Sequence, residues 1–151
     1  MDRPSCPAVV ARAASASLSK QALAVFAVEA ARPEALPKAK RLAKRREFLH
    51  VYETGRKLFS RYTVVFFLPS GLPHSRIGIT ATKKLGKANV RNRLKRWTRE
   101  VYRRKREPLG IDRRALDVVV NVKPNARDAS FREFSQDFEK VLQRVVSDAG
   151  R

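Results

Sequence analysis

The chain has 151 residues and a formal net charge of +20 at pH 7, with 34 Lys and Arg against 14 Asp and Glu. This length fits one domain with a modest core, and the charge favours a polyanionic partner. No apolar run is long enough to span a membrane, and the single cysteine, Cys6, excludes an internal disulfide framework, which fits a reducing, cytoplasmic location.

Residues 1–37 are predicted to form an Ala-rich, flexible extension to a domain at 38–151. They hold four basic and three acidic residues, so almost all of the net charge belongs to the domain. An apolar stretch at 22–28 weakly resembles a targeting segment, but Lys20 and Glu29 bracket it. An extension is therefore the preferred interpretation.

The first domain segment, residues 41–55, predicts a helix with Phe48 and Tyr52 one above the other and Gly55 at its end. Strands are predicted over 61–68 and 76–82, and we expect them to pair as an antiparallel hairpin. The second strand has an apolar face and a face of small and polar residues, the latter being Gly78, Thr80 and Thr82.

The segment 83–106 is the most unusual part of the chain. Twelve of its 24 residues are Lys or Arg, and one, Glu100, is acidic. At 3.6 residues per turn it presents one narrow apolar stripe, made of Val90, Leu94, Trp97 and Val101. The other side is polar and basic, with Asn92, Arg96, Arg99 and Arg103 opposite the stripe and Arg91, Lys95 and Arg106 beside them. Solvated helix faces usually mix charge signs, and Arg suits bidentate phosphate contacts, so this face predicts nucleic-acid binding.

After this helix, residues 117–122 predict a nearly continuous apolar strand, and Ser130 opens a capping box for a last helix. The element order predicts an α+β fold in which the strands at 76–82 and 117–122 are parallel, because a crossover helix joins them. The general rule makes such a crossover right-handed.

The basic segment also carries a specific resemblance. Lys83-Lys84-Leu85-Gly86-Lys87-Ala88, followed by Arg91-Asn92-Arg93-Leu94-Lys95-Arg96 and Arg99-Glu100, resembles the signature of the protein subunit of bacterial ribonuclease P. The resemblance extends from about residue 41 to about residue 146, with Asn89 and Trp97 standing where the family more often has aliphatic residues. It implies a two-layer sandwich of a mixed four-stranded sheet with helices in αβββαβα order, ribosomal-protein-like. It also implies an extra strand near 58–60 and a left-handed crossover, which we adopt here.

The resemblance implies that an RNA subunit cleaves precursor tRNA, with Mg²⁺ held mainly by RNA, and that the protein binds both RNAs. The residues expected to contact the catalytic RNA are Lys83, Lys84, Lys87, Arg91, Asn92, Arg93, Lys95, Arg96 and Arg99. The chain's carboxylates are scattered, and no nucleophile motif or phosphate loop is present. We therefore predict no catalytic residue, no metal ligand, no membrane association and no obligate protein partner.

A second implied surface is a cleft for the single-stranded 5′ leader of precursor tRNA, with Phe48, Tyr52 and Phe66 at its aromatic positions. Exposed rings let unpaired bases stack with little sequence preference. From their spacing alone the three rings are better explained as ordinary core, and the resemblance reverses that preference. Arg45, Arg46 and Arg61 are weaker candidates for leader phosphates, with solvated surface as their alternative.

Two other functions fit the charge. A structural RNA-binding protein, such as a ribosomal protein, would share both charge and fold class, but the Arg-Asn-Arg helix after a Lys pair favours ribonuclease P. A DNA-binding module is less favoured, because neither a helix-turn-helix nor a zinc-finger spacing is visible.

Overall fold

The structure, a computed structural model, describes residues 36–151. The predicted extension therefore lies almost wholly outside the described residues. Leu36, which the sequence assigned to it, is buried in the domain core. The helices are α2 (Arg45–Thr54), α3 (Ala88–Lys105) and α4 (Phe131–Ala149), and the strands are β1 (Arg56–Phe59), β2 (Thr63–Pro69), β3 (Arg76–Ala81) and β4 (Leu116–Val122).

The four strands form one mixed sheet in the order β1-β2-β4-β3. The predicted parallel pairing of β3 with β4 is confirmed, and β1 is the extra strand expected near 58–60. The predicted hairpin of β2 with β3 is wrong, because β4 lies between them and pairs with both. β4 takes the centre because Val118, Val119 and Val120 are fully buried, and a strand apolar on both faces needs cover on both.

The connection from β2 to β3 spans the start of β4 and is held to it by hydrogen bonds. The Ser70 amide donates to the Ala115 carbonyl at 2.8 Å. The Ser75 hydroxyl donates to the Ile111 carbonyl at 2.7 Å and accepts the Leu116 amide at 2.9 Å. These bonds fix the register at which β4 enters the sheet.

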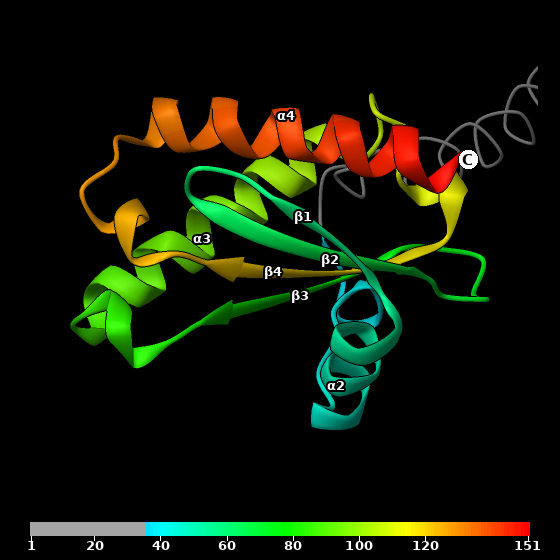
Figure 1. Cartoon of the computed structure of the whole chain (residues 1–151), viewed down its shortest axis with the longest axis horizontal. Helices are drawn as coiled ribbons and strands as arrows, with labels where there is room; N and C mark the ends of the chain where they lie inside the picture. The colour runs from blue at the N-terminus through cyan, green and yellow to red at the C-terminus, as the bar shows by residue number, and fades with distance from the viewer. Residues whose placement is uncertain (1–35) are drawn as a thin grey trace, which may run out of the picture. The chain divides into compact units, whose positions relative to one another are not determined.

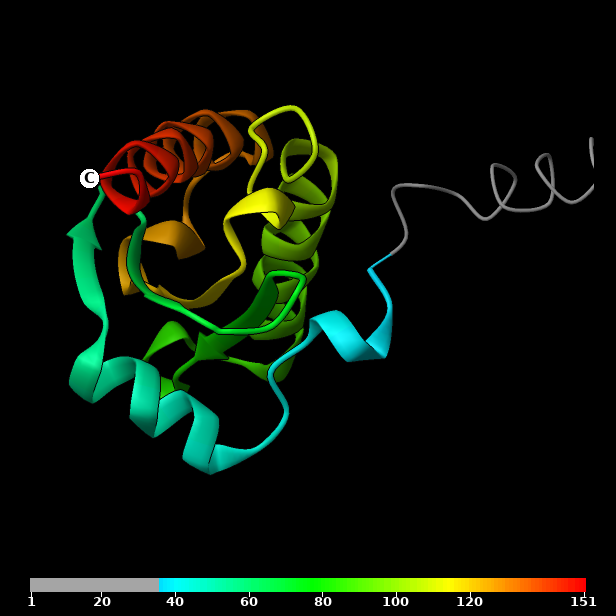
Figure 2. The same ribbon diagram turned by 90° about the vertical axis from the view of Figure 1, so that its right-hand side faces the viewer.

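Helices lie on both faces of the sheet (Figure 1). α3 and α4 cover one face, and the short α2 covers part of the other, as the turned view also shows (Figure 2). The two layers of the predicted sandwich are the sheet and the pair of helices α3 and α4. Helix α2 lies on the opposite face of the sheet and covers only part of it. Part of the α2-side face therefore stays open.

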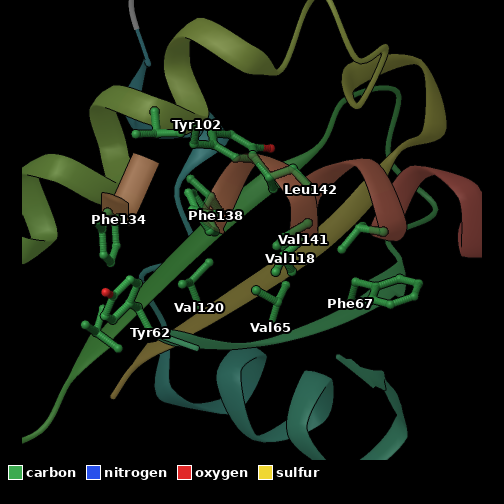
Figure 3. Close-up of a cluster of buried hydrophobic side chains, with 14 of the residues drawn as sticks. Tyr62, Val65, Phe67, Tyr102, Val118, Val120, Phe134, Phe138, Val141 and Leu142 are labelled. Atoms are coloured by element: carbon green, nitrogen blue, oxygen red, sulfur yellow. The ribbon is translucent and has the colours of Figure 1, made fainter. Parts of the chain in front are cut away.

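The main core lies between the sheet and the α3 and α4 layer (Figure 3). Val118 and Val120 of β4 meet Phe138 and Leu142 of α4 there, all with no exposed surface. The predicted capping box at the start of α4 is confirmed, since the Ser130 hydroxyl accepts the Glu133 amide at 3.3 Å. Helix α3 therefore packs against a rigid core.

Candidate nucleic-acid interface

Helix α3 docks on the core by a wider face than the predicted stripe. Leu94 and Val101 are buried as expected, and so are Thr98 and Tyr102. Burial raises the pKa of the Tyr102 hydroxyl well above its usual value. Four residues after Tyr102, Arg106 continues this buried row and is only 3% exposed, so its predicted outward position is wrong.

Trp97 is turned mainly toward α4. It is half-buried, and its ring packs against Phe131 and Phe134 of α4, with centroid distances of 5.5 and 6.0 Å. The guanidinium of Arg93 lies 5.1 Å from the centroid of the Trp97 ring and donates to the Arg127 carbonyl at 3.0 Å. Arg93 is thus held on the surface in a fixed position.

The outward side of α3 carries a shallow basic groove, which is hollowed into the first half of the helix. No carboxylate lines it. Its lining residues are Asn89, Asn92, Arg93, Lys95, Arg96, Trp97 and Arg99. Five of the nine predicted contact residues for the catalytic RNA therefore meet in one groove. Arg91 lies half-buried on the same helix and does not line it.

The other three predicted residues, Lys83, Lys84 and Lys87, are exposed just before α3. The short 3-10 helix Lys83–Leu85 is anchored by Leu85, which is fully buried. Gly86 follows with φ +108°, a conformation that side-chain-bearing residues rarely adopt. This turn places the lysines beside the amino end of α3, where the helix dipole adds positive potential.

Charge compensation differs along α3. Near its carboxyl end, Glu100 pairs with Arg103 at 2.8 Å and with Arg104 at 2.7 Å, and Lys105 pairs with Glu139 at 2.7 Å. Among residues 36–151, no ion pair neutralises the basic groove or the lysines before it. The unneutralised charge is therefore concentrated over the first half of the helix.

The second surface is the aromatic hollow, which lies between α2 and the sheet and is lined by Phe48, Tyr52, Thr80 and Lys95, among others. Its volume of about 420 Å³ lies in the range of sites for small organic ligands, so a flat base has room to enter. Phe48 and Tyr52 are half-buried. Each packs against a small buried cluster of Leu42, Val51 and Val119, and each also lines the hollow. They are neither fully core nor fully exposed.

Tyr52 is held by polar and aromatic contacts. Its hydroxyl donates to the Asn121 side-chain oxygen at 2.7 Å and lies 3.0 Å from the Thr80 hydroxyl. Phe66 meets the Tyr52 ring edge to face, with centroids 4.8 Å apart and an interplanar angle of 88°. Phe66 does not line the hollow itself and joins the group through Tyr52.

Phe48 lies directly over Gly78 of β3. A Cβ atom at Gly78 would stand 2.5 Å from Phe48 Cε1, closer than two carbon atoms can approach. The face of small residues predicted for this strand therefore has a structural role, because the absence of a side chain at Gly78 lets the Phe48 ring approach the sheet closely.

An ion-pair network positions α2 over the sheet. Arg76 of β3 donates to both carboxylate oxygens of Asp117, at 2.9 and 2.6 Å, and to Glu47 of α2 at 2.8 Å. The hydrogen bond with Asp117 raises the pKa of Arg76. Burial works to raise the pKa of Glu47, but hydrogen bonds from Arg76 and from the Lys44 backbone bring it below its usual value.

The basic groove and the aromatic hollow meet at one residue. Lys95 lines both, and with Arg99 it also lines a smaller hollow next to Phe48. Of the weaker candidates, Arg45 lines the aromatic hollow and Arg46 is exposed on the same helix. Arg61 lines a separate hollow with Glu133 and is not brought to the aromatic one.

The family model for ribonuclease P matches residues 36–146. The chain belongs to the ribonuclease P protein family. The ribonuclease P protein component of Thermotoga maritima is 38% identical over 108 residues, covering 72% of this chain and 83% of its own. That of Desulfovibrio desulfuricans is 40% identical, covering 74% and 81%. The solved ribonuclease P protein of Staphylococcus aureus aligns with TM-score 0.64 and 32% identity, over 72% of this chain and 96% of its own.

Family membership makes this chain the protein component of a ribonucleoprotein endoribonuclease and removes the two rival functions. Within residues 36–151, no group of three or more His, Cys, Asp or Glu side chains is placed to hold a metal ion. None of the described helices combines the length and hydropathy that a membrane span requires.

Proposed function

We propose that this chain binds the catalytic RNA of ribonuclease P and the single-stranded 5′ leader of precursor tRNA. It thereby assists the removal of the leader by endonucleolytic cleavage, which leaves the mature 5′ end of the tRNA. The basic groove and the lysines before α3 are the site for the catalytic RNA, and the aromatic hollow is the site for the leader. The complex works in the cytoplasm, without an obligate protein partner.

The observation that carries this proposal is the sharing of Lys95 by the two surfaces. A strand that leaves the tRNA and stacks on Phe48 and Tyr52 would lie beside the groove that meets the catalytic RNA. The protein would then hold the substrate and the ribozyme close together.

In this proposal, cleavage is the work of the RNA subunit and of Mg²⁺ that RNA holds. The protein's own contribution is electrostatic and positional. Its unpaired cations neutralise phosphates where two RNAs approach each other, and the Asn92 amide adds a group that can both donate and accept.

The test is to add the purified chain to a bacterial ribonuclease P RNA and precursor tRNA at low Mg²⁺. We expect stimulated 5′ cleavage and tighter binding of precursor than of mature tRNA. Absence of any stimulation would discard the proposal. Stimulation with equal affinity for both tRNAs would discard only the leader site.

A further inference from the structure

The part of the sheet that α2 leaves open carries an aromatic ring with no partner ring. Phe59, the last residue of β1, is 60% exposed, the largest exposed fraction among the large apolar side chains of the described chain. β1 is an edge strand, and an exposed apolar ring on a sheet edge is an aggregation liability unless it has a use.

Two cations flank this ring. Lys57 Nζ lies 4.7 Å and Lys123 Nζ 5.8 Å from the centroid of Phe59. Lys57 Nζ also lies 5.3 Å from the Phe66 ring, which contacts Tyr52. A continuous row of contacts therefore runs from Tyr52 in the aromatic hollow to Phe59, by way of Phe66 and Lys57.

Strand register puts Lys57, Phe59 and Phe66 on one face of the sheet. Lys57 pairs with Phe66 and Phe59 with Val64, and side chains two residues apart point to the same side. Phe59 thus lies about 7 Å further along β1 than Lys57.

The backbone after Phe59 is fixed by α4. The Ser60 hydroxyl donates to Asp137 Oδ2 at 2.6 Å, and the Tyr62 amide donates to the same oxygen at 3.1 Å. The Lys123 ammonium donates to the Ser60 carbonyl at 2.5 Å. The backbone next to Phe59 and the Lys123 ammonium are therefore held in place before any ligand arrives.

We propose that Phe59, flanked by Lys57 and Lys123, is a second base-stacking site for single-stranded RNA, which takes a leader nucleotide further from the cleavage site than those in the aromatic hollow. The ring is 60% exposed and has surface on which a base can stack when the mobile Lys57 side chain shifts, and the ammonium groups offer contacts for the neighbouring phosphates. This inference rests on the proposed function, because it needs a leader that already occupies the hollow.

The experiment uses the holoenzyme, reconstituted from this chain and a bacterial ribonuclease P RNA, with precursor tRNAs whose leaders increase in length. For the unmodified protein we expect affinity to rise as the leader fills the hollow and to rise again when it reaches Phe59. Phe59→Ala should remove only the second rise, with a loss on the order of tenfold for long leaders.

Phe59→Tyr keeps a stacking face and should keep the second rise. Leu72→Ala, which truncates another exposed apolar side chain on the loop before β3, serves as the matched control and should change nothing. Thermal unfolding of each variant checks that the fold is intact.

A second rise that survives Phe59→Ala would overturn this inference and leave the leader site standing. A loss with Phe59→Ala that is equal for long leaders, short leaders and mature tRNA would also overturn it. No leader dependence with the unmodified protein would overturn both this inference and the leader site in the aromatic hollow, and would leave the proposed site for the catalytic RNA standing.

Discussion

The basic groove and the aromatic hollow are built in different ways. The groove is lined by residues of helix α3 alone, and within residues 36–151 its exposed cations Arg93, Arg96 and Arg99 belong to no ion pair. The rest of the domain serves this groove only as the core on which the helix docks. The hollow is lined by residues of α2, β3 and α3. A hydrogen bond positions the Tyr52 ring, the glycine at position 78 leaves room for the Phe48 ring, and an ion-pair network holds α2 on the sheet. Changes to the groove should therefore affect RNA binding alone, whereas changes to the hollow should couple binding to stability.

Removing a ring from the hollow should have the largest effect. Tyr52→Ala is expected to weaken binding of precursor tRNA by roughly 1–3 kcal/mol more than binding of mature tRNA, because a leader base loses its stacking partner. Equilibrium binding of both tRNAs to the reconstituted holoenzyme measures the difference.

The matched control for that variant is Tyr52→Phe. It keeps the ring and loses the hydrogen bonds to Thr80 and Asn121, so most of the discrimination should remain. Equal losses for precursor and mature tRNA with Tyr52→Ala would place Tyr52 in the core instead.

Filling the space under Phe48 tests whether the hollow depends on its floor. Gly78→Ala should push the Phe48 ring away from the sheet and cost about 1 kcal/mol of stability or somewhat more. Chemical denaturation measures the stability, and precursor binding should weaken while the salt dependence of catalytic-RNA binding stays the same. A change in that salt dependence would mean that the two surfaces are not independent.

Single cations of the groove should have smaller and purely electrostatic effects. Arg96→Ala or Arg93→Ala should make the slope of log affinity for the catalytic RNA against log salt shallower by somewhat less than one unit each. Arg104→Ala is the control, since Arg104 is on the same helix but pairs with Glu100 and lies outside the groove. An unchanged slope for Arg96→Ala would show that this guanidinium meets no phosphate.

The smallest effect is expected at the ion pair that holds α2. The pKa of Glu47 is lowered in the folded protein, so its pairing with Arg76 stabilises the fold above the unfolded pKa of about 4.3 and is lost as the pH falls through the folded value. Glu47→Gln should thus cost about 1 kcal/mol or less at pH 7, and the difference from the unmodified protein should vanish in acid. A difference that persists at low pH would assign the effect to packing.

The same contrast explains what the sequence could predict. The groove and the capping box of α4 are local, so the spacing of Leu94, Val101 and Ser130 was enough to place them. Pairing of β2 with β3 was predicted wrongly, because an alternating pattern tells which face a residue is on but not which strand lies next to it.

Contacts between residues far apart in the chain are harder to predict from the sequence. Arg76 finds Glu47 at a separation of 29 residues and Asp117 at 41, and no spacing rule joins them. One sign was available, since Asp117 opens the nearly continuous apolar strand predicted at 117–122, and a buried carboxylate there requires a cationic partner. The position of Arg106 was missed because the buried face of α3 is broader than its apolar stripe.

The insertion of β4 between β2 and β3 has a consequence for biosynthesis. Both flanking strands and the whole of α3 are synthesised before β4, and the sheet cannot close until residue 122 has been made. Until β4 is in place, the twelve positive charges between residues 83 and 106 lack the folded sheet that later orients them. A polyanion that is already nearby, including the RNA partner itself, would screen their mutual repulsion at the stage when it hinders folding most.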